Sequence, residues 1–134
     1  MENDDHKIWH ESDPDWDIRM DDIYNKGTVY GLVCPLTNRV RYIGSTRQGL
    51  STRLSLHFYA NVSLTGKWMR KLKRLGKRDE VEIIALEENL PHSKLHDAEI
   101  AMIEFYYLMG YDLTNVKHNP KYNPLLRTCL NLPE

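Results

Sequence analysis

Four side chains that could act together on a phosphate group occur near one another in the sequence: Tyr30, Tyr42, Arg53 and His57. A phenol can donate or accept a proton, a guanidinium can bind a phosphate through two parallel hydrogen bonds, and an imidazole can exchange a proton near neutral pH. Each residue alone has a structural explanation, because hairpin tyrosines are often core residues and a helical Arg-His pair can simply face solvent. Their combination favours a site for a phosphodiester.

The two tyrosines belong to a predicted β-hairpin. β-Branched and aromatic residues flank a turn-forming run at residues 35–38, so we expect residues 28–44 to form two strands. If the connection leaves an odd number of residues unpaired, Tyr30 and Tyr42 lie opposite each other on one face. Two phenols would then share one small surface.

A first helix is predicted at about residues 52–61. Glycine and hydroxyl-bearing residues at positions 49–52 favour a helix start there. Arg53 and His57 are four positions apart, so they fall on the same side of this helix. We therefore expect the guanidinium and the imidazole to lie beside the phenols of the hairpin.

A second helix, at about residues 66–75, is rich in basic residues. Its apolar face is expected to carry Trp68, Leu72 and Leu75, and Gly76 suits its end. Five cations on its other faces are expected to contact a nucleic-acid backbone: Lys67, Arg70, Lys71, Lys73 and Arg74. A charge run taken alone more often marks a solvated helix face, so this expectation depends on the neighbouring site.

The net charge of −1 conceals an uneven distribution. Residues 1–26 hold nine acids and three bases, a net charge of −6, whereas the other 108 residues hold 15 bases and 10 acids, a net charge of +5. We expect the acidic N-terminal segment to be partly disordered, since it has few apolar anchors. Such a segment can recruit a partner or cover a basic cleft.

A buried strand is predicted at residues 81–86, followed by a long helix from residue 91 or 92 to residue 110. The inward stripe of this helix is expected to contain Leu95, Ala98, Met102, Phe105 or Tyr106, and Met109. Glu99 lies beside the stripe, where a carboxylate is costly unless it has a partner. Glu104 lies about 140° further round the helix and should face elsewhere.

Size and composition indicate one ordinary globular domain. The chain has 134 residues, of which 41% are hydrophobic and 28% charged. No apolar run approaches the roughly 18 residues of a membrane helix, and the acidic N-terminus does not resemble a secretory signal. We therefore expect a cytoplasmic protein with no membrane partner. Cys34 and Cys129 are expected to be reduced.

The order and spacing of these residues resemble the GIY-YIG endonuclease family, which is named after two short motifs on neighbouring strands. The second motif is intact at residues 42–44, and the first is degenerate at residues 28–30. Further residues match the family's arginine-histidine helix, its metal-binding glutamate and the asparagine that commonly follows: Arg53, His57, Glu99 and Asn115. The resemblance covers about residues 28–116. Some relatives carry a lysine just after the second motif, where this chain has Ser45.

The resemblance implies an α+β fold, with a small three-stranded antiparallel sheet flanked by helices at residues 27–116 and a tail at residues 117–134 packed on it. It also implies an endonuclease that hydrolyses duplex or branched DNA with the help of one Mg²⁺ or Mn²⁺ ion. Glu99 would hold this ion, since hard cations prefer carboxylate oxygens. The family includes members with very different DNA targets, so the substrate stays open.

Roles for the matched residues follow from the same resemblance. Arg53 would bind the scissile phosphate, and one of Tyr30, Tyr42 and His57 would accept the proton of the attacking water. A tyrosine could do so only if its pKa, normally about 10, were lowered by nearby positive charge. Asn115 would be a supporting hydrogen bonder.

Two other readings stay open. The chain could be a catalytically idle nucleic-acid-binding module with the same fold, although intact Arg53 and Glu99 argue against that. It could also be an interaction protein that acts through the acidic segment at residues 1–26. The sequence equally leaves open a homodimer or an additional specificity subunit.

Overall fold

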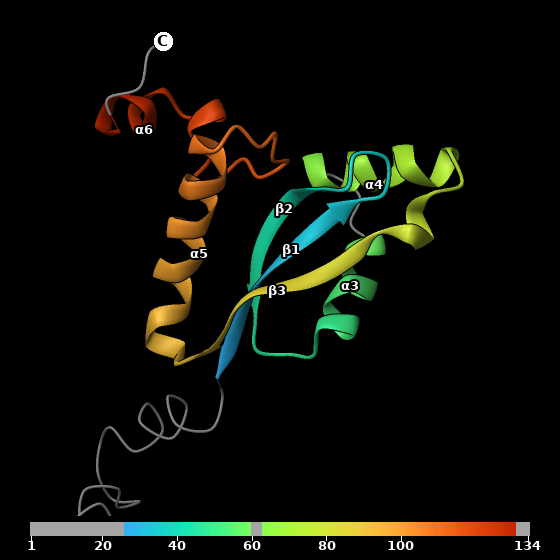
Figure 1. Ribbon diagram of the computed structural model, residues 1–134, viewed down its shortest axis with the longest axis horizontal. Helices are drawn as coiled ribbons and strands as arrows, with labels where there is room; N and C mark the ends of the chain where they lie inside the picture. Colours follow the sequence, from blue (N-terminus) through green and yellow to red (C-terminus); the bar gives the residue numbers. More distant parts are fainter. Residues whose placement is uncertain (1–25, 60–62, 131–134) are drawn as a thin grey trace, which may run out of the picture.

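The computed structural model describes residues 26–59 and 63–130 and shows an antiparallel sheet between two layers of helices (Figure 1). The strand order is β2-β1-β3, with β1 at Gly27–Cys34, β2 at Arg39–Thr46 and β3 at Glu82–Leu90. The main helices are α3 (Leu50–Phe58), α4 (Leu64–Arg74) and α5 (His92–Leu108). α5 covers one face of the sheet, and α3 and α4 cover the other. The small three-stranded antiparallel sheet flanked by helices is confirmed. Residues 1–25, which hold nearly all of the acidic segment, lie outside the described residues.

The predicted hairpin is present, but its register differs from the simplest expectation. Tyr30 pairs with Gly44, and Tyr42 pairs with Leu32, so the two phenols are diagonal neighbours rather than directly opposite. Their ring centroids are 6.3 Å apart. The connection contains an even number of residues, and a bulge near Arg41 restores the parity that puts both side chains on one face. The shared face is confirmed, and the direct pairing is wrong.

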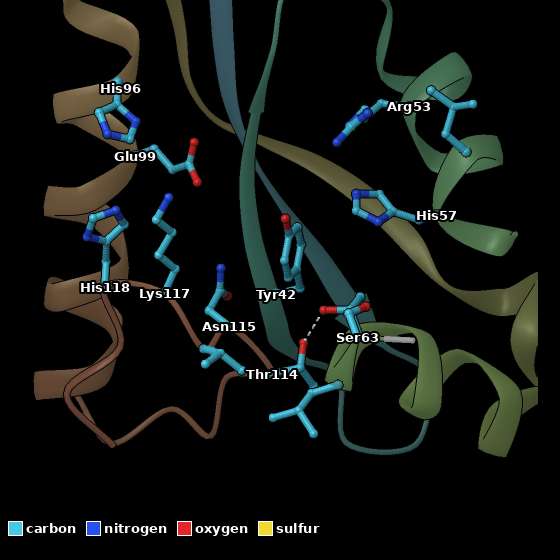
Figure 2. A pocket seen from close by; sticks show the side chains of 14 residues that line it. Tyr42, Arg53, His57, Ser63, His96, Glu99, Thr114, Asn115, Lys117 and His118 are labelled. Carbon is cyan, nitrogen blue, oxygen red and sulfur yellow. Dashed lines mark hydrogen bonds between the residues drawn. The ribbon is translucent and has the colours of Figure 1, made fainter. Parts of the chain in front are cut away.

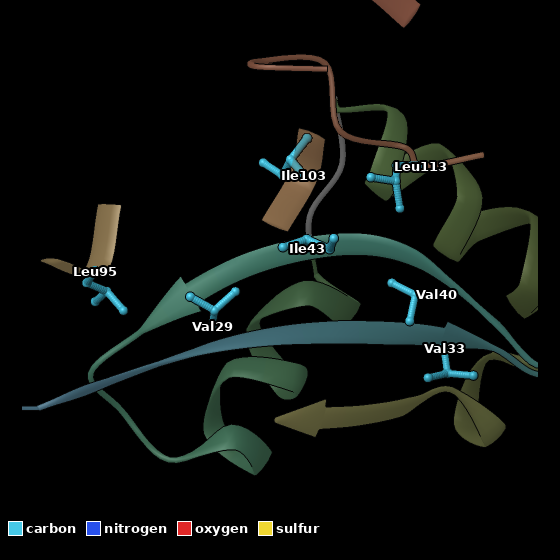
Figure 3. Close-up of a cluster of buried hydrophobic side chains, with 7 residues drawn as sticks. All are labelled: Val29, Val33, Val40, Ile43, Leu95, Ile103 and Leu113. Carbon is cyan, nitrogen blue, oxygen red and sulfur yellow. The ribbon is translucent and has the colours of Figure 1, made fainter. Parts of the chain in front are cut away.

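Each face of the sheet has its own hydrophobic core. Figure 3 shows the core under α5, which consists of Val29, Val33, Val40, Ile43, Leu95, Ile103 and Leu113. The other core, under α3 and α4, contains Tyr30, Leu32, Cys34, Trp68, Met69, Leu72 and Val81. Strand alternation explains the division, because neighbouring residues such as Val29 and Tyr30 point to opposite faces. Tyr30 therefore belongs to a core and to the candidate site at once.

The predicted basic helix forms with Ser63 as its N-cap, whose side chain accepts a hydrogen bond from the Gly66 nitrogen at 3.0 Å. Trp68 and Leu72 are buried as expected. Leu75 is 54% exposed, contrary to the prediction, because the helix ends at Arg74 and the chain turns away through Gly76 with a φ of +72°. α3 begins two residues earlier than predicted, at Leu50.

The strand predicted as buried is instead an exposed edge strand. β3 extends to Leu90 and pairs only with β1 among the described residues, and most of its side chains are exposed. Ile83 and Leu86 are half-buried against the two cores. Short apolar runs do not distinguish a central strand from an edge strand, because the position within the sheet depends on pairings that are distant in sequence.

α5 lies where the sequence predicts it, and its inward stripe is largely as expected. Leu95 is buried, while Ala98, Met102 and Tyr106 pack against the core. Phe105 is 55% exposed, so the predicted alternative Tyr106 is the one that holds, and Met109, which is 60% exposed, does not belong to the stripe. Tyr106 is the inward member of the Phe105–Tyr106 pair. The helix ends at Leu108, and Gly110 has a φ of +90°.

The tail contains two short helices that the sequence analysis did not predict, η2 (Pro120–Tyr122) and α6 (Pro124–Cys129). Asn119 and Asn123 cap them, accepting hydrogen bonds from the backbone nitrogens of the second residue of each helix. Each asparagine is followed by a proline at the first helical position, which is a recognisable start signal. Among the described residues, none of the helices has the length and apolar character needed to cross a membrane. Cys34 and Cys129 are both free thiols.

Candidate active site

Three side chains from two elements form a continuous polar chain on the α3 side of the sheet. The Tyr30 hydroxyl of β1 lies 2.7 Å from Nε2 of His57, and Nε of Arg53 donates to the same hydroxyl at 3.2 Å. Arg53 and His57 are one turn apart on α3, as predicted. The ring of Tyr42, on β2, has its centroid 5.0 Å from that of His57. The structure thus brings together the four residues that the sequence singled out.

Gly44 makes this arrangement sterically feasible. A Cβ atom built on Gly44 would lie 2.5 Å from the Tyr30 hydroxyl oxygen and 2.9 Å from Cε2 of Tyr42. Any larger residue at this position would push the Tyr30 phenol away from Arg53 and His57. The glycine of the second motif is therefore needed for space rather than for an unusual backbone conformation.

Glu99 extends from α5 towards the site, and a residue of β2 positions its carboxylate. Oγ of Ser45, the residue after Gly44 on β2, donates a hydrogen bond to Oε1 of Glu99 at 2.5 Å. This bond supplies the partner that a half-buried carboxylate needs. Figure 2 shows the carboxylate of Glu99 pointing into the space between α5 and the residues of α3. This role of Ser45 was not predicted from the sequence.

One cavity of about 670 Å³ joins these groups (Figure 2). Tyr42, Arg53 and His57 line one side of it, and Glu99, Asn115 and Lys117 line another. Tyr30 is fully buried behind this wall, with an exposed fraction of 0%. A molecule in the cavity would therefore meet His57 and Tyr42 directly and Tyr30 only through its neighbours.

Asn115 fastens the segment after α5 to the edge of the sheet. Its Oδ1 accepts from the Ile43 nitrogen at 2.9 Å, and its Nδ2 donates to the Ile43 oxygen at 2.8 Å. Both bonds are buried, and they imitate a pair of strand hydrogen bonds. The backbone carbonyl oxygen of Asn115 in turn accepts a hydrogen bond from Nδ2 of Asn119 at 2.7 Å. This network fixes one cavity wall.

Burial and charge determine the protonation states of the site. Burial, with a further contribution from the Arg53 charge, lowers the pKa of His57 to about 4, so its imidazole is neutral at pH 7. Burial raises the pKa of both Tyr30 and Tyr42, so both phenols keep their protons. The hydrogen bond to Tyr30 raises the pKa of Arg53. The lowered tyrosine pKa that a tyrosine base would need is thus absent from these described groups.

The basic residues of α4 are divided between two further hollows. Lys67 and Lys71 line one of them, together with Arg41, Asp112 and Lys121. The other hollow, beside Phe58 and Tyr59, is lined by Arg70, Lys73, Arg74 and Arg78. The α4 cations were expected to form a single surface, without Arg41 or Lys121. Helical spacing could have separated the two groups, since residues 67 and 71 are four positions apart.

The cavity offers one carboxylate, that of Glu99, as a ligand for a hard cation. Among the described residues, no three His, Cys, Asp or Glu side chains gather into a ligand group. Glu99 nevertheless provides one carboxylate, oriented by Ser45, at the edge of an open polar cavity. Mg²⁺ usually keeps several waters and takes only one or two protein carboxylates, with substrate phosphates completing its shell. Glu99 is the residue that would hold such an ion.

Comparisons of this chain with protein-family models, with curated proteins and with solved structures gave no match. The resemblance to the GIY-YIG endonucleases thus stays a prediction from the residues and their order. Any function must be argued from the chemistry of the cavity and its surroundings.

Proposed function

We propose that this protein is a metal-dependent endonuclease that hydrolyses phosphodiester bonds in DNA. The observation that carries the proposal is the chain of hydrogen bonds from Arg53 through Tyr30 to His57, which lies across one cavity from Glu99. Core packing alone gives no reason for a guanidinium, a phenol and a neutral imidazole to be linked beside an open cavity. Phosphodiester hydrolysis needs an anion binder, a base and a cation site, and this cavity supports all three.

Arg53 is suited to bind the scissile phosphate. The Tyr30 oxygen accepts a hydrogen bond from Nε of Arg53. The two terminal amino groups of the guanidinium can then donate to phosphate oxygens. The same hydrogen bond raises the pKa of Arg53 and so favours its charged form. A guanidinium held in this way stabilises the extra negative charge that develops on the phosphoryl oxygens.

His57 is the residue best suited to accept the proton of the attacking water. Its lowered pKa keeps it neutral at pH 7, and it lines the cavity. In the tautomer in which Nε2–H donates to the Tyr30 oxygen, Nδ1 carries the lone pair that takes the proton. Tyr42 keeps its proton and can orient the water. Tyr30 acts as the link that holds both Arg53 and His57 in place.

The reaction exchanges one P–O bond for another. The water oxygen forms a bond to phosphorus and gives a proton to His57, while the bond to the 3′ oxygen breaks. The departing 3′ oxygen takes a proton from a solvent water, and His57 returns its proton to solvent, which leaves a 3′ hydroxyl and a 5′ phosphate. A Mg²⁺ or Mn²⁺ ion bound at Glu99 would supply positive charge to the departing oxygen. Glu99 itself positions that charge and takes no proton in this scheme.

The test is a cleavage assay with the purified full chain on plasmid and branched DNA, with Mg²⁺, with Mn²⁺ and with a chelator. We expect cleavage only with a divalent ion. Arg53→Ala should lower it about 100- to 1000-fold, as loss of a transition-state donor does. Its unfolding free energy should fall by only about 1 kcal/mol, because one partly exposed hydrogen bond is lost. A folded Arg53→Ala protein with parental activity would refute the mechanism.

The basic hollows beside the cavity also support a second candidate function, a nucleic-acid-binding module without catalysis. It predicts that DNA is bound but left intact under every metal condition. The third reading, an interaction protein acting through its acidic segment, concerns residues outside the described part of the chain.

A further inference from the structure

We propose that the DNA strand being cut continues from the active-site cavity into the hollow between α4 and η2, where Lys67, Lys71, Lys121 and Arg41 bind its phosphates. This inference rests on the proposed function and specifies the path of its substrate. It assigns a binding role to Arg41 and Lys121, and it assigns only one side of α4 to the strand that is cut.

The hollow is small and strongly basic. Its volume is about 280 Å³, and its lining contains four cations and one carboxylate, Asp112. The cations come from three separate elements: Arg41 from β2, Lys67 and Lys71 from α4, and Lys121 from η2. Convergence of like charges on one concave surface is unfavourable in the free protein, and it favours a polyanion as the ligand.

The hollow adjoins the active-site cavity. Leu64 and Thr114 line both of them. At this boundary, the Thr65 hydroxyl of α4 and the Thr114 hydroxyl are 2.9 Å apart and share a hydrogen bond. In Figure 1 the orange segment after α5 crosses to this end of α4. A strand leaving the cavity past Thr114 would therefore meet Lys67 and Lys71 next.

Two of the four cations are already held in position. Asp112 accepts from Arg41 NH1 through Oδ2 at 2.7 Å and from Lys121 Nζ through Oδ1 at 2.7 Å. The Arg41 guanidinium also lies 6.0 Å from the centre of the Trp68 ring. These contacts fix the cations before a ligand arrives, which lowers the entropic cost of binding. Asp112 neutralises one charge, so the hollow keeps a net positive charge.

An aromatic ring stands at the edge of the same hollow. Tyr122 lines it and is 42% exposed, and Nζ of Lys121 lies 5.3 Å from its ring centre. Basic grooves that follow a strand commonly combine phosphate contacts with an exposed aromatic ring on which a base can stack. Lys121 and Tyr122 supply both groups from one short helix.

The hollow on the other side of α4 provides the contrast. It is also basic, but among the described residues it has no lining residue in common with the active-site cavity. Lys71 and Lys73 are therefore a matched pair: the same side chain, on the same helix, exposed in both cases, facing different hollows. Only Lys71 should contact the strand that passes through the cavity.

The experiment measures the salt dependence of DNA binding by the full chain, with Glu99→Gln as the background so that the DNA stays intact. Fluorescence anisotropy with a labelled branched DNA gives the Kd at several salt concentrations from about 50 to 200 mM. In a plot of log Kd against log salt concentration, each phosphate contact contributes about 0.7 to 0.9 to the slope. We expect Lys71→Gln and Lys121→Gln each to reduce the slope by about one contact. Lys73→Gln should keep the parental slope. Thermal unfolding verifies that all variants are folded.

The outcomes separate this inference from the proposed function. If Lys73→Gln lowers the slope and Lys71→Gln does not, the strand runs over the other side of α4 and the inference is wrong. An unchanged slope in the Lys71→Gln, Lys121→Gln double variant also overturns it. If the slopes behave as expected but the parental protein cuts no DNA with any metal, the endonuclease proposal fails and the binding path stands.

Discussion

Glu99 and Glu104 lie on the same helix and differ in what surrounds them. Glu99 accepts from Ser45 and lines the cavity, whereas Glu104 is half-buried and does not appear among the described lining residues. Substituting Glu99 removes the proposed cation ligand, whereas substituting Glu104 removes only a carboxylate from the same helix. Comparing the two variants therefore separates these two effects.

We expect Glu99→Gln to lower DNA cleavage about 1000-fold, since a catalytic metal ion is worth several kcal/mol. DNA binding should persist or improve, because a negative charge beside the phosphate is removed. Glu104→Gln should retain cleavage close to that of the parent. A nicking assay and a binding assay at the same salt concentration compare the two. An inactive Glu104→Gln beside an active Glu99→Gln would mean that the metal site is misplaced.

The neutral state of His57 has a consequence for stability. Its pKa is about 4 in the folded protein and about 6.5 in an unfolded chain, so between these values the unfolded state binds the proton more tightly. The stability that His57 contributes is therefore fully present above about pH 6.5 and is lost as the pH falls towards 4. Urea unfolding at pH 7.5 and pH 5 should show this loss in the parent.

The matched variants are His57→Gln and His92→Gln. His57→Gln should make the unfolding free energy less dependent on pH in this window, because the titrating group is gone and the amide NH2 group can still donate to the Tyr30 oxygen. His92 is exposed at the start of α5, so His92→Gln should keep the parental dependence. If both variants behave like the parent, His57 is not held neutral by its surroundings.

At the scale of elements, the most informative connection is between Asn115 and β2. Two buried hydrogen bonds from one side chain hold the segment after α5 against Ile43, and the backbone groups of Ile43 have no nearby solvent to replace them. An unsatisfied buried group costs about 1 to 3 kcal/mol. We expect Asn115→Ala to lower the unfolding free energy by about 2 to 6 kcal/mol, because two such groups of Ile43 lose their partner.

Asn115→Asp is the control for this connection. It keeps an acceptor for the Ile43 nitrogen but sets an anionic oxygen against the buried Ile43 oxygen, so its loss of stability should be at least as large as that of Asn115→Ala. Cleavage should fall in both variants, because one wall of the cavity is displaced. Chemical unfolding and the nicking assay measure the two effects. Full stability in Asn115→Ala would show that the segment is held by other contacts.

Local patterns in the sequence were sufficient for most elements and for the grouping of Tyr30, Tyr42, Arg53 and His57. The hairpin, the basic helix and the long α5 each have a turn signal, a cap or a helical stripe that acts over a few residues. The register at the bulge, the exposure of β3 and the Ser45–Glu99 bond depend on contacts between residues far apart in sequence. Such contacts leave no local pattern. The two short helices of the tail, by contrast, each begin with a local start signal, an asparagine followed by a proline.

At the scale of the whole molecule, charge is the organising feature. Cations line two hollows on either side of α4, one of which adjoins the cavity, whereas residues 1–26 carry a net charge of −6. Opposite charges on one chain attract each other at an effective concentration that a separate ligand rarely reaches. The acidic segment is therefore expected to compete with DNA for the basic hollows.

We predict that removing residues 1–24 tightens DNA binding, most strongly at low ionic strength. The Debye length is about 30 Å at 0.01 M salt and about 8 Å at 0.15 M salt, so the competition should weaken as salt is added. Kd measured at several salt concentrations for the parent and the truncated chain gives the difference. In the full-length control, Asp13, Asp15, Asp17 and Asp21 are replaced by Asn, which removes charge and keeps Trp9 and Trp16. If both changes tighten binding, charge is responsible. If the truncated chain is folded and neither change has an effect, the acidic segment does not cover the basic surface.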